Sequence, residues 1–169
     1  MKAIETRYAG CRFRSRLEAR WAVFFDAMEI EWQYEPQGFH LPSGPYLPDF
    51  YLPNTGKHAT PDDEVVDATG TWLEVKGQRA THTERIKCEE LGHAADEPVF
   101  LLQGDVPRQA RWAIGIMLPA GTIKALTAPL WNPREGVWKE EQWVWGTRVD
   151  DSLTAARSAR FEHGESPSW

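Results

Sequence analysis

The sequence predicts an α/β domain in which helices flank a mixed sheet. A strand, a helix and a second strand follow one another between residues 72 and 103, which is the order of a parallel βαβ unit. Before them, apolar residues recur at helical spacing after Ser15, and apolar and polar residues alternate from residue 30 to residue 35, as in a half-buried strand. The chain has 169 residues, of which 41% are hydrophobic, so one compact core is achievable.

The first half of the chain predicts one helix and two strands. The helix begins at Ser15, and its apolar stripe consists of Leu17, Trp21, Phe24, Phe25 and Met28. A strand follows at residues 30–34, and residues 36–45 are expected to form a turn region. Residues 46–53 are β-prone but contain Pro48 and Pro53, which indicates a short or edge strand.

The middle of the chain contains the βαβ unit. Residues 54–70 are polar and acidic with no sustained period, which predicts a loop. We expect a strand at residues 72–77, a helix at 79–95 with Ile86 and Leu91 facing inward, and a buried strand at 99–103. These elements complete a core that we place at residues 1–105.

Residues 106–169 are interpreted as a Trp-rich β/α extension packed on that core, either within the same domain or as a small subdomain. Strands are expected at 113–118 and 122–127, a hairpin at 131–145, and a last helix capped by Asp151 or Ser152 and running to Phe161. Six of the nine tryptophans lie in this extension. Packing, a homodimer interface, or stacking on unpaired bases each account for them.

Charge is distributed unevenly along the chain, although its net value is −6. Residues 1–25 carry six basic and two acidic side chains, and residues 26–75 carry ten acidic side chains and one lysine. An acidic protein can still hold a nucleic acid when its positive charges gather on one face. The sequence shows no apolar run long enough to cross a membrane and no signal-like start, and two cysteines are too few for a disulfide framework. We therefore expect a cytoplasmic protein without a membrane partner.

Two acidic residues and a lysine lie in the predicted strands. Asp49 is at the centre of residues 46–53, and Glu74 and Lys76 leave the same face of residues 72–77. If these strands are neighbours, both carboxylates and the lysine converge. Two carboxylates and a backbone carbonyl, such as that of Val75, suit Mg²⁺ or Mn²⁺, and a neighbouring lysine can orient or deprotonate water. The pattern indicates metal-assisted phosphodiester hydrolysis.

Each of these residues also has a purely structural explanation. A glutamate and a lysine two residues apart on a strand often form a solvated pair, and an aspartate after a proline is often a turn residue. Glu18 fits a capping box with Ser15, but it also lies at the margin of the apolar stripe, from which it could reach Asp49 and Glu74. Both readings of Glu18 stay open.

Four ordered blocks together resemble the PD-(D/E)XK nuclease superfamily, and within it the phage endonuclease I group of junction-resolving enzymes. The blocks are RSRLEARW (14–21), YEP (34–36), YLPDFYLP (46–53) and WLEVKG (72–77), and the likeness covers about residues 8–105. The resemblance implies a restriction-endonuclease-like fold and a Mg²⁺- or Mn²⁺-dependent DNA endonuclease of phage or prophage type, acting on branched, junction-like DNA in a bacterial or infected host cell. The segment 54–70 is longer and more acidic than in that group, and residues 106–169 have no counterpart there.

The resemblance also implies roles for individual residues. Asp49 and Glu74 would be metal ligands, Lys76 would activate water or stabilise charge, and Glu18 would be a further acidic group at the metal or its water. We expect phosphate contacts from the first helix, its approach and the region after Lys76, namely Arg12, Arg14, Arg16, Arg20, Gln78, Arg79 and Arg85. An intertwined homodimer, as in the junction enzymes, is possible. An idle DNA-binding or virion-assembly protein on the same scaffold, or an RNase, is the alternative function.

Overall fold

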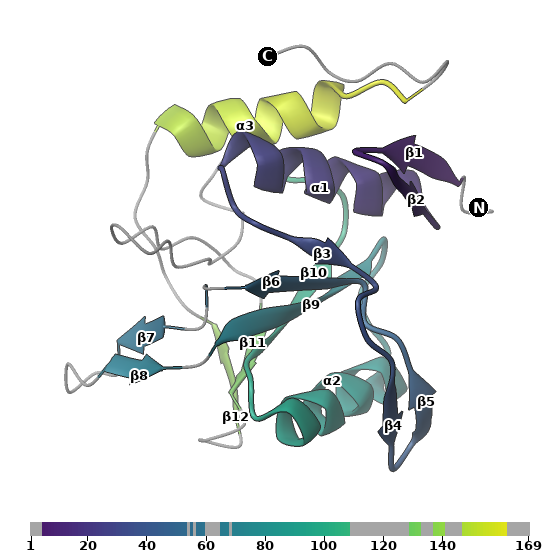
Figure 1. Cartoon of the computed structure of the whole chain (residues 1–169), viewed down its shortest axis with the longest axis vertical. Coiled ribbons are helices and arrows are strands. Elements are labelled where there is room, and N and C mark those ends of the chain that lie inside the picture. Colours follow the sequence, from purple (N-terminus) through teal and green to yellow (C-terminus); the bar gives the residue numbers. More distant parts are fainter. Residues whose placement is uncertain are drawn as a thin grey trace.

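A six-stranded mixed sheet forms the centre of the computed structural model (Figure 1), which describes residues 5–53, 55, 57–59, 65–67, 69–108, 129–132, 137–140 and 147–161. The strand order is β12-β11-β10-β9-β6-β3. The strand bounds are β3 Gln33–Tyr34, β6 Phe50–Pro53, β9 Gly70–Lys76, β10 Val99–Gln103, β11 Pro129–Asn132 and β12 Val137–Glu140. Neighbouring strands are antiparallel except for β9 and β10, which run parallel. The predicted α/β class with a mixed sheet is therefore confirmed.

The described residues form three helices, which cover both faces of this sheet. Helices α1 (Arg16–Ala27) and α3 (Thr147–Ser158) lie on one side, and α2 (His82–Ala95) lies on the other (Figure 1). Alternation along β9 explains the two layers: Leu73 and Val75 join the core with α1 and α3, and Trp72 joins a second core with Leu91 of α2. The expected βαβ unit is thus present as β9-α2-β10.

Side-chain caps set two of the helix starts. The Ser15 hydroxyl accepts a hydrogen bond from the Glu18 N–H over 3.2 Å, so α1 begins where the sequence predicts. A capping box of Thr81 and Glu84 starts α2 at His82, three residues later than expected. The expected cap of α3 was wrong: the helix begins at Thr147, and Asp151 and Ser152 lie within it. The earlier start extends the buried apolar stripe of α3, formed by Val149, Leu153 and Ala156.

Within the described residues, three short hairpins lie outside the six-stranded sheet, and the sequence predicts none of them. β1 (Thr6–Tyr8) and β2 (Cys11–Phe13) are joined by Ala9 and Gly10, both with positive φ. β4 (Phe39–Leu41) pairs with β5 (Gly44–Tyr46) inside the expected turn region. β7 (Lys57–Ala59) pairs with β8 (Val65–Asp67), so the loop expected at 54–70 is wrong for these six positions. Strands of three residues are too short to give a readable alternation.

Two strands differ from expectation in extent. The strand expected at residues 30–34 is reduced to β3, and Ile30 is instead buried in the core beside α1. β6 is short, as predicted, but it is not an edge strand, because β3 and β9 flank it.

The extension joins the core where it is described. β11 and β12 extend the sheet beside β10. They form the hairpin expected at 131–145, which begins two residues earlier, at Pro129. The strands expected at 113–118 and 122–127, and Trp143 and Trp145, lie outside the described residues. In the part of the chain that is described, none of the helices has the length and apolarity to cross a membrane.

Candidate active site

Asp49 and Glu74 stand opposite each other across two adjacent strands. The β6–β9 register pairs Phe50 with Leu73, so Asp49, immediately before β6, lies against Glu74 of β9. Both carboxylates are buried, with 5% of Asp49 and 4% of Glu74 exposed. The Val75 N–H donates to Oδ2 of Asp49 over 2.7 Å, which fixes the aspartate against β9. The structure therefore brings together the two carboxylates that the sequence singled out.

Lys76 lies beside this carboxylate pair. Its Nζ forms an ion pair with Oε1 of Glu74 and lies 3.6 Å from Oε1 of Glu84, in the first turn of α2. Burial lowers the pKa of Lys76, but the adjacent Glu74 carboxylate, with Asp49 and Glu84, outweighs this effect and raises it. The ammonium form is thus favoured, and the side chain acts as a hydrogen-bond donor and a fixed positive charge.

Glu18, in the first turn of α1, is the third acidic residue of the centre that Asp49, Glu74 and Lys76 form. Its Oε2 accepts hydrogen bonds from the Tyr34 hydroxyl at 2.6 Å and from the Arg14 N–H at 3.1 Å, and the Ser15 hydroxyl donates to Oε1. In a capping box this carboxylate would accept from the Ser15 N–H. Here it accepts from the Arg14 N–H, one residue earlier. The side chain is buried, and its charge contributes to the raised pKa of Asp49. Glu18 therefore stabilises the start of α1, and its charge also acts on Asp49.

The electrostatics of the pair favour a cation. Burial raises the pKa of Asp49, the Glu74 carboxylate opposite raises it further, and the Val75 N–H and Lys76 act in the other direction. Two buried carboxylates that face each other repel when both are ionised. A divalent cation between them would remove this repulsion.

The oxygens of this pair have partners but retain acceptor capacity. Glu74 Oε2 accepts from the Tyr46 hydroxyl at 2.6 Å, and Asp49 Oδ1 is 3.2 Å from Nη2 of Arg14. Among the described residues, no three His, Cys, Asp or Glu side chains are grouped as a metal cluster. Mg²⁺ is commonly held by one or two carboxylates with waters and phosphate oxygens, and each carboxylate offers about four lone-pair positions. Asp49, Glu74 and the Val75 carbonyl thus suit such an ion in number and in chemistry.

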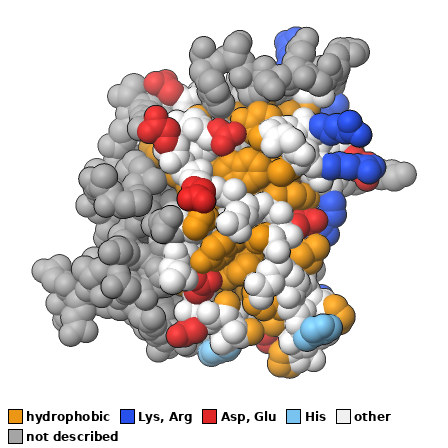
Figure 2. All heavy atoms as spheres, viewed as in Figure 1, with side chains coloured by type: hydrophobic (Ala, Val, Ile, Leu, Met, Phe, Trp, Pro, Cys, Tyr) orange, Lys and Arg blue, Asp and Glu red, His pale blue; other side chains and the backbone are white. Residues whose placement is uncertain are grey.

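The arginines expected to contact DNA lie in different surroundings. Arg14 reaches the centre itself, where it pairs with Asp49 and Glu35, whereas Arg12 pairs with the exposed Glu5 and Arg20 with Asp105. Lys and Arg side chains gather on one side of the face shown in Figure 2, over β1, β2 and the start of α1. Gln78 and Arg79 are exposed just after Lys76, and Arg16 and Arg85 are half-buried. The basic residues before and within α1 therefore adjoin the carboxylate pair.

Three residues at the centre had no role in the sequence-based prediction. Tyr34 holds Glu18, Tyr46 holds Glu74, and Glu35 pairs with Arg14. Tyr34 and Glu35 belong to the YEP block, which marks them without indicating a contact. Tyr46 belongs to the YLPDFYLP block, which likewise marks it without indicating a contact, because its hydrogen bond to Glu74 depends on how the β4–β5 hairpin lies over β9.

A scan against protein-family models and searches of curated proteins and solved structures found no match to this chain.

Proposed function

We propose that this protein is a divalent-metal-dependent DNA endonuclease of the PD-(D/E)XK type. The observation that carries the proposal is the meeting of Asp49 and Glu74 across β6 and β9, with Lys76 bonded to Glu74. The resemblance in four ordered sequence blocks supports the same activity independently of the distances. The proposal includes a restriction-endonuclease-like fold and a preference for branched DNA.

The residues of the centre have separate roles in phosphodiester hydrolysis. Asp49, Glu74 and the Val75 carbonyl would hold Mg²⁺ or Mn²⁺, which when bound lowers the pKa of water and polarises a phosphoryl oxygen. Lys76 donates a hydrogen bond to the phosphate, and its positive charge stabilises the negative charge that the phosphate gains in the transition state. Tyr46 and Tyr34 keep Glu74 and Glu18 in place through hydrogen bonds. Arg14, which is exposed, provides a guanidinium beside Asp49, and this group suits a phosphate oxygen.

Digestion of a defined substrate panel tests this proposal. The panel contains supercoiled, linear, single-stranded and four-way-junction DNA and a labelled RNA, each incubated with Mg²⁺ or with EDTA. We expect Mg²⁺-dependent nicking that is fastest on the junction and absent in Asp49→Asn and Glu74→Gln. The matched control is Glu31→Gln, an exposed carboxylate before β3, which keeps wild-type activity. Cleavage in EDTA, or no cleavage of any substrate, would contradict the proposal, and cleavage of RNA alone would make the protein an RNase.

A second function, a catalytically idle DNA-binding or assembly protein on the same scaffold, is favoured by one observation. Each of the Asp49 and Glu74 carboxylates already has protein partners, which hold it in place in a scaffold that binds no metal. Thermal denaturation with Mn²⁺ separates the two functions, because a ligand that binds the folded state raises its stability. The nuclease is stabilised by Mn²⁺, and Asp49→Ala loses this effect; an idle scaffold shows neither.

A further inference from the structure

A polar cavity lies on the α2 side of the sheet, near the end of α2. It has a volume of about 490 Å³, within the usual range for small-molecule sites. Its lining residues come from β3, the segment after it, β6, the start of β9 and the end of α2; those used below are Gln37, Phe39, Tyr51, Thr69, Trp72 and Glu97. None of the carboxylates or the lysine of the proposed active site lines it. The cavity is therefore a separate feature.

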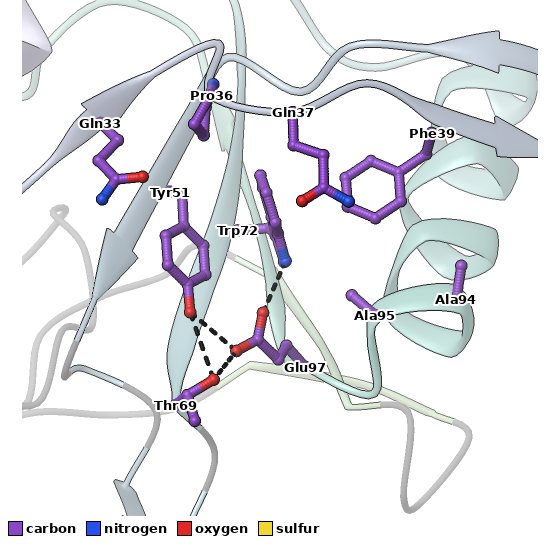
Figure 3. Close-up of a pocket in the computed structure, with 10 residues that line it drawn as sticks. All are labelled: Gln33, Pro36, Gln37, Phe39, Tyr51, Thr69, Trp72, Ala94, Ala95 and Glu97. Carbon is purple, nitrogen blue, oxygen red and sulfur yellow. Dashed lines mark hydrogen bonds between the residues drawn. The ribbon is translucent and has the colours of Figure 1, made fainter.

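Aromatic rings form one wall of the cavity. The rings of Tyr51 and Trp72 are 4.6 Å apart between centroids, and Phe39 meets Trp72 edge-on at 5.0 Å. Figure 3 shows Tyr51 and Trp72 side by side, both directed toward Glu97. Gly70 makes this arrangement possible, because a Cβ there would lie 2.4 Å from Cζ of Tyr51. Aromatic rings carry electron-rich faces, which attract cations.

A buried carboxylate forms the floor of the cavity. Glu97 is 9% exposed; its Oε2 accepts from the Trp72 indole N–H at 2.8 Å, and its Oε1 accepts from the hydroxyls of Tyr51, at 2.9 Å, and Thr69. All three of these partners are neutral, so the hydrogen bonds orient the carboxylate without cancelling its charge. A buried carboxylate is normally paired with a positive charge, and among the described residues only the Trp72 indole bonds Oε2, which leaves it one lone-pair position.

The surroundings increase the negative potential. Ala94 and Ala95, at the end of α2, line the cavity, and the end of a helix carries a partial negative charge. His93, the basic residue in the last turn, is not among the lining residues, and none of the described residues that line the cavity is a lysine or an arginine. A phosphate group is repelled by such a site, whereas a cation is attracted by both the carboxylate and the ring faces.

We propose that this cavity binds an organic cation, an alkylguanidinium or alkylammonium group, between the Tyr51, Trp72 and Phe39 rings and the Glu97 carboxylate. The cationic head donates to the open position of Glu97, and the Gln37 amide at the rim accepts from it. The alkyl chain lies along the rings. The group belongs either to a free small molecule, such as a polyamine, or to an arginine or lysine side chain, since both present the same chemistry.

Calorimetric titration with matched ligands tests the proposal on the full-length protein. The probes are butylguanidinium, its neutral isostere butylurea, spermidine, and N-acetyl-argininamide as a protein-like arginine. We expect saturable binding of the cations, at least tenfold weaker binding of butylurea, and a shift of one indole N–H resonance in the NMR spectrum. Tighter binding of spermidine than of N-acetyl-argininamide identifies a free polyamine, and the reverse order identifies a side chain. Equal binding of butylurea, or no binding of any cation, would overturn the proposal.

Two variants keep the test falsifiable if one of them fails to fold. Glu97→Gln keeps an acceptor for the indole but removes the charge, and we expect cation affinity to fall at least tenfold. Ala94→Arg, at an exposed helix position, places a guanidinium at the cavity and blocks binding. Thr83→Arg adds the same charge at an exposed position at the other end of α2 and leaves binding unchanged. Wild-type binding by Ala94→Arg would overturn the proposal.

Discussion

Single hydrogen bonds and ion pairs fix the position of each acidic side chain in the proposed active site. Glu74 is held on one oxygen by Tyr46 and on the other by Lys76, and Asp49 is held by the Val75 N–H and Arg14. Each carboxylate thus has two partners, so a substitution at one partner leaves the other contact intact.

Lys76 provides the positive charge beside Glu74. Lys76→Ala removes the positive charge beside Glu74 but leaves the Tyr46 hydrogen bond, so the variant folds and still binds DNA. We expect cleavage to fall by a factor of about 10²–10³, the usual cost of losing one transition-state donor. Single-turnover cleavage of the preferred substrate measures this factor, and circular dichroism checks the fold. Equal cleavage by the variant and the wild type would remove Lys76 from the mechanism.

The two roles of Glu18 can be separated by Glu18→Gln. The amide oxygen can still accept from Tyr34 or from the Arg14 N–H, so the start of α1 is largely preserved. The charge near Asp49 is lost, and we expect cleavage to decrease while thermal stability changes little. Full activity would show that Glu18 serves only the helix.

Gly70 is required for packing rather than for chemistry. In Gly70→Ala the new Cβ would lie 2.4 Å from Cζ of Tyr51 and 2.7 Å from the Leu52 carbonyl oxygen, so backbone and ring must shift. We expect a loss of about 1–3 kcal/mol in the free energy of unfolding, measured by urea denaturation. Gly38→Ala is the matched control, because its Cβ meets only the Tyr46 carbonyl oxygen, at 3.7 Å. Similar losses in both variants would contradict the steric explanation.

At the scale of elements, the start of α2 links helix capping to the proposed active site. Glu84 accepts from the Thr81 N–H and hydroxyl and lies 3.6 Å from Lys76. The Thr81 backbone hydrogen bond is the main cause of the lowered pKa of Glu84, and Lys76 contributes. The cap therefore stabilises α2 in the ionised form of Glu84.

This capping contribution predicts a pH-dependent stability. Because folding lowers the pKa of Glu84, its stabilisation is complete above the ordinary value of 4.5 and is lost as the pH falls through the lowered value. We expect Glu84→Gln to be less stable than the wild type near neutral pH, by up to about 1 kcal/mol, since the group is half exposed. The difference should close in acid. Urea denaturation at several pH values measures it, and a difference that does not depend on pH would contradict the assignment.

At the scale of the whole molecule, positive charge is concentrated near the proposed active site of an acidic chain. The basic side chains over β1, β2 and the start of α1 lie on one side, while Asp and Glu are spread over the rest of the face shown in Figure 2. This asymmetry is how an acidic protein attracts a polyanion at one place.

Salt dependence of DNA binding tests this distribution. Each phosphate contact contributes about −0.9 to the slope of log affinity against log salt for duplex DNA. Arg12→Ala with Arg16→Ala should weaken binding and reduce that slope by about 2, in Ca²⁺ or EDTA to prevent cleavage. Arg157→Ala, in α3, is the control, because its guanidinium bonds the Pro107 carbonyl. An unchanged slope in the double variant would exclude both arginines from the phosphate contacts.

Local signals in the sequence predicted the longer elements correctly. The Ser15 cap and the apolar stripe after it defined α1, and the order of strand, helix and strand defined β9, α2 and β10. The three-residue hairpins and β3 were missed or overextended, because segments of two or three residues carry no readable period. The cap of α3 was misplaced because Asp and Ser are typical cap residues, but here Asp151 and Ser152 lie inside the helix.

The sequence by itself determined that Glu74 and Lys76 share one face of a strand, because side chains alternate along any strand. Only the tertiary structure decided that Asp49 stands opposite Glu74 and that the Tyr46 hydroxyl bonds Glu74. It also decided that Glu97 accepts hydrogen bonds from the Tyr51 hydroxyl and the Trp72 indole. Such pairings join residues about 25 to 46 positions apart, as the hydrogen bonds of Val75 with Asp49 and of Tyr51 with Glu97 show. Periodicity acts over a few neighbouring residues, whereas strand order and register follow from how the whole chain buries its two apolar layers.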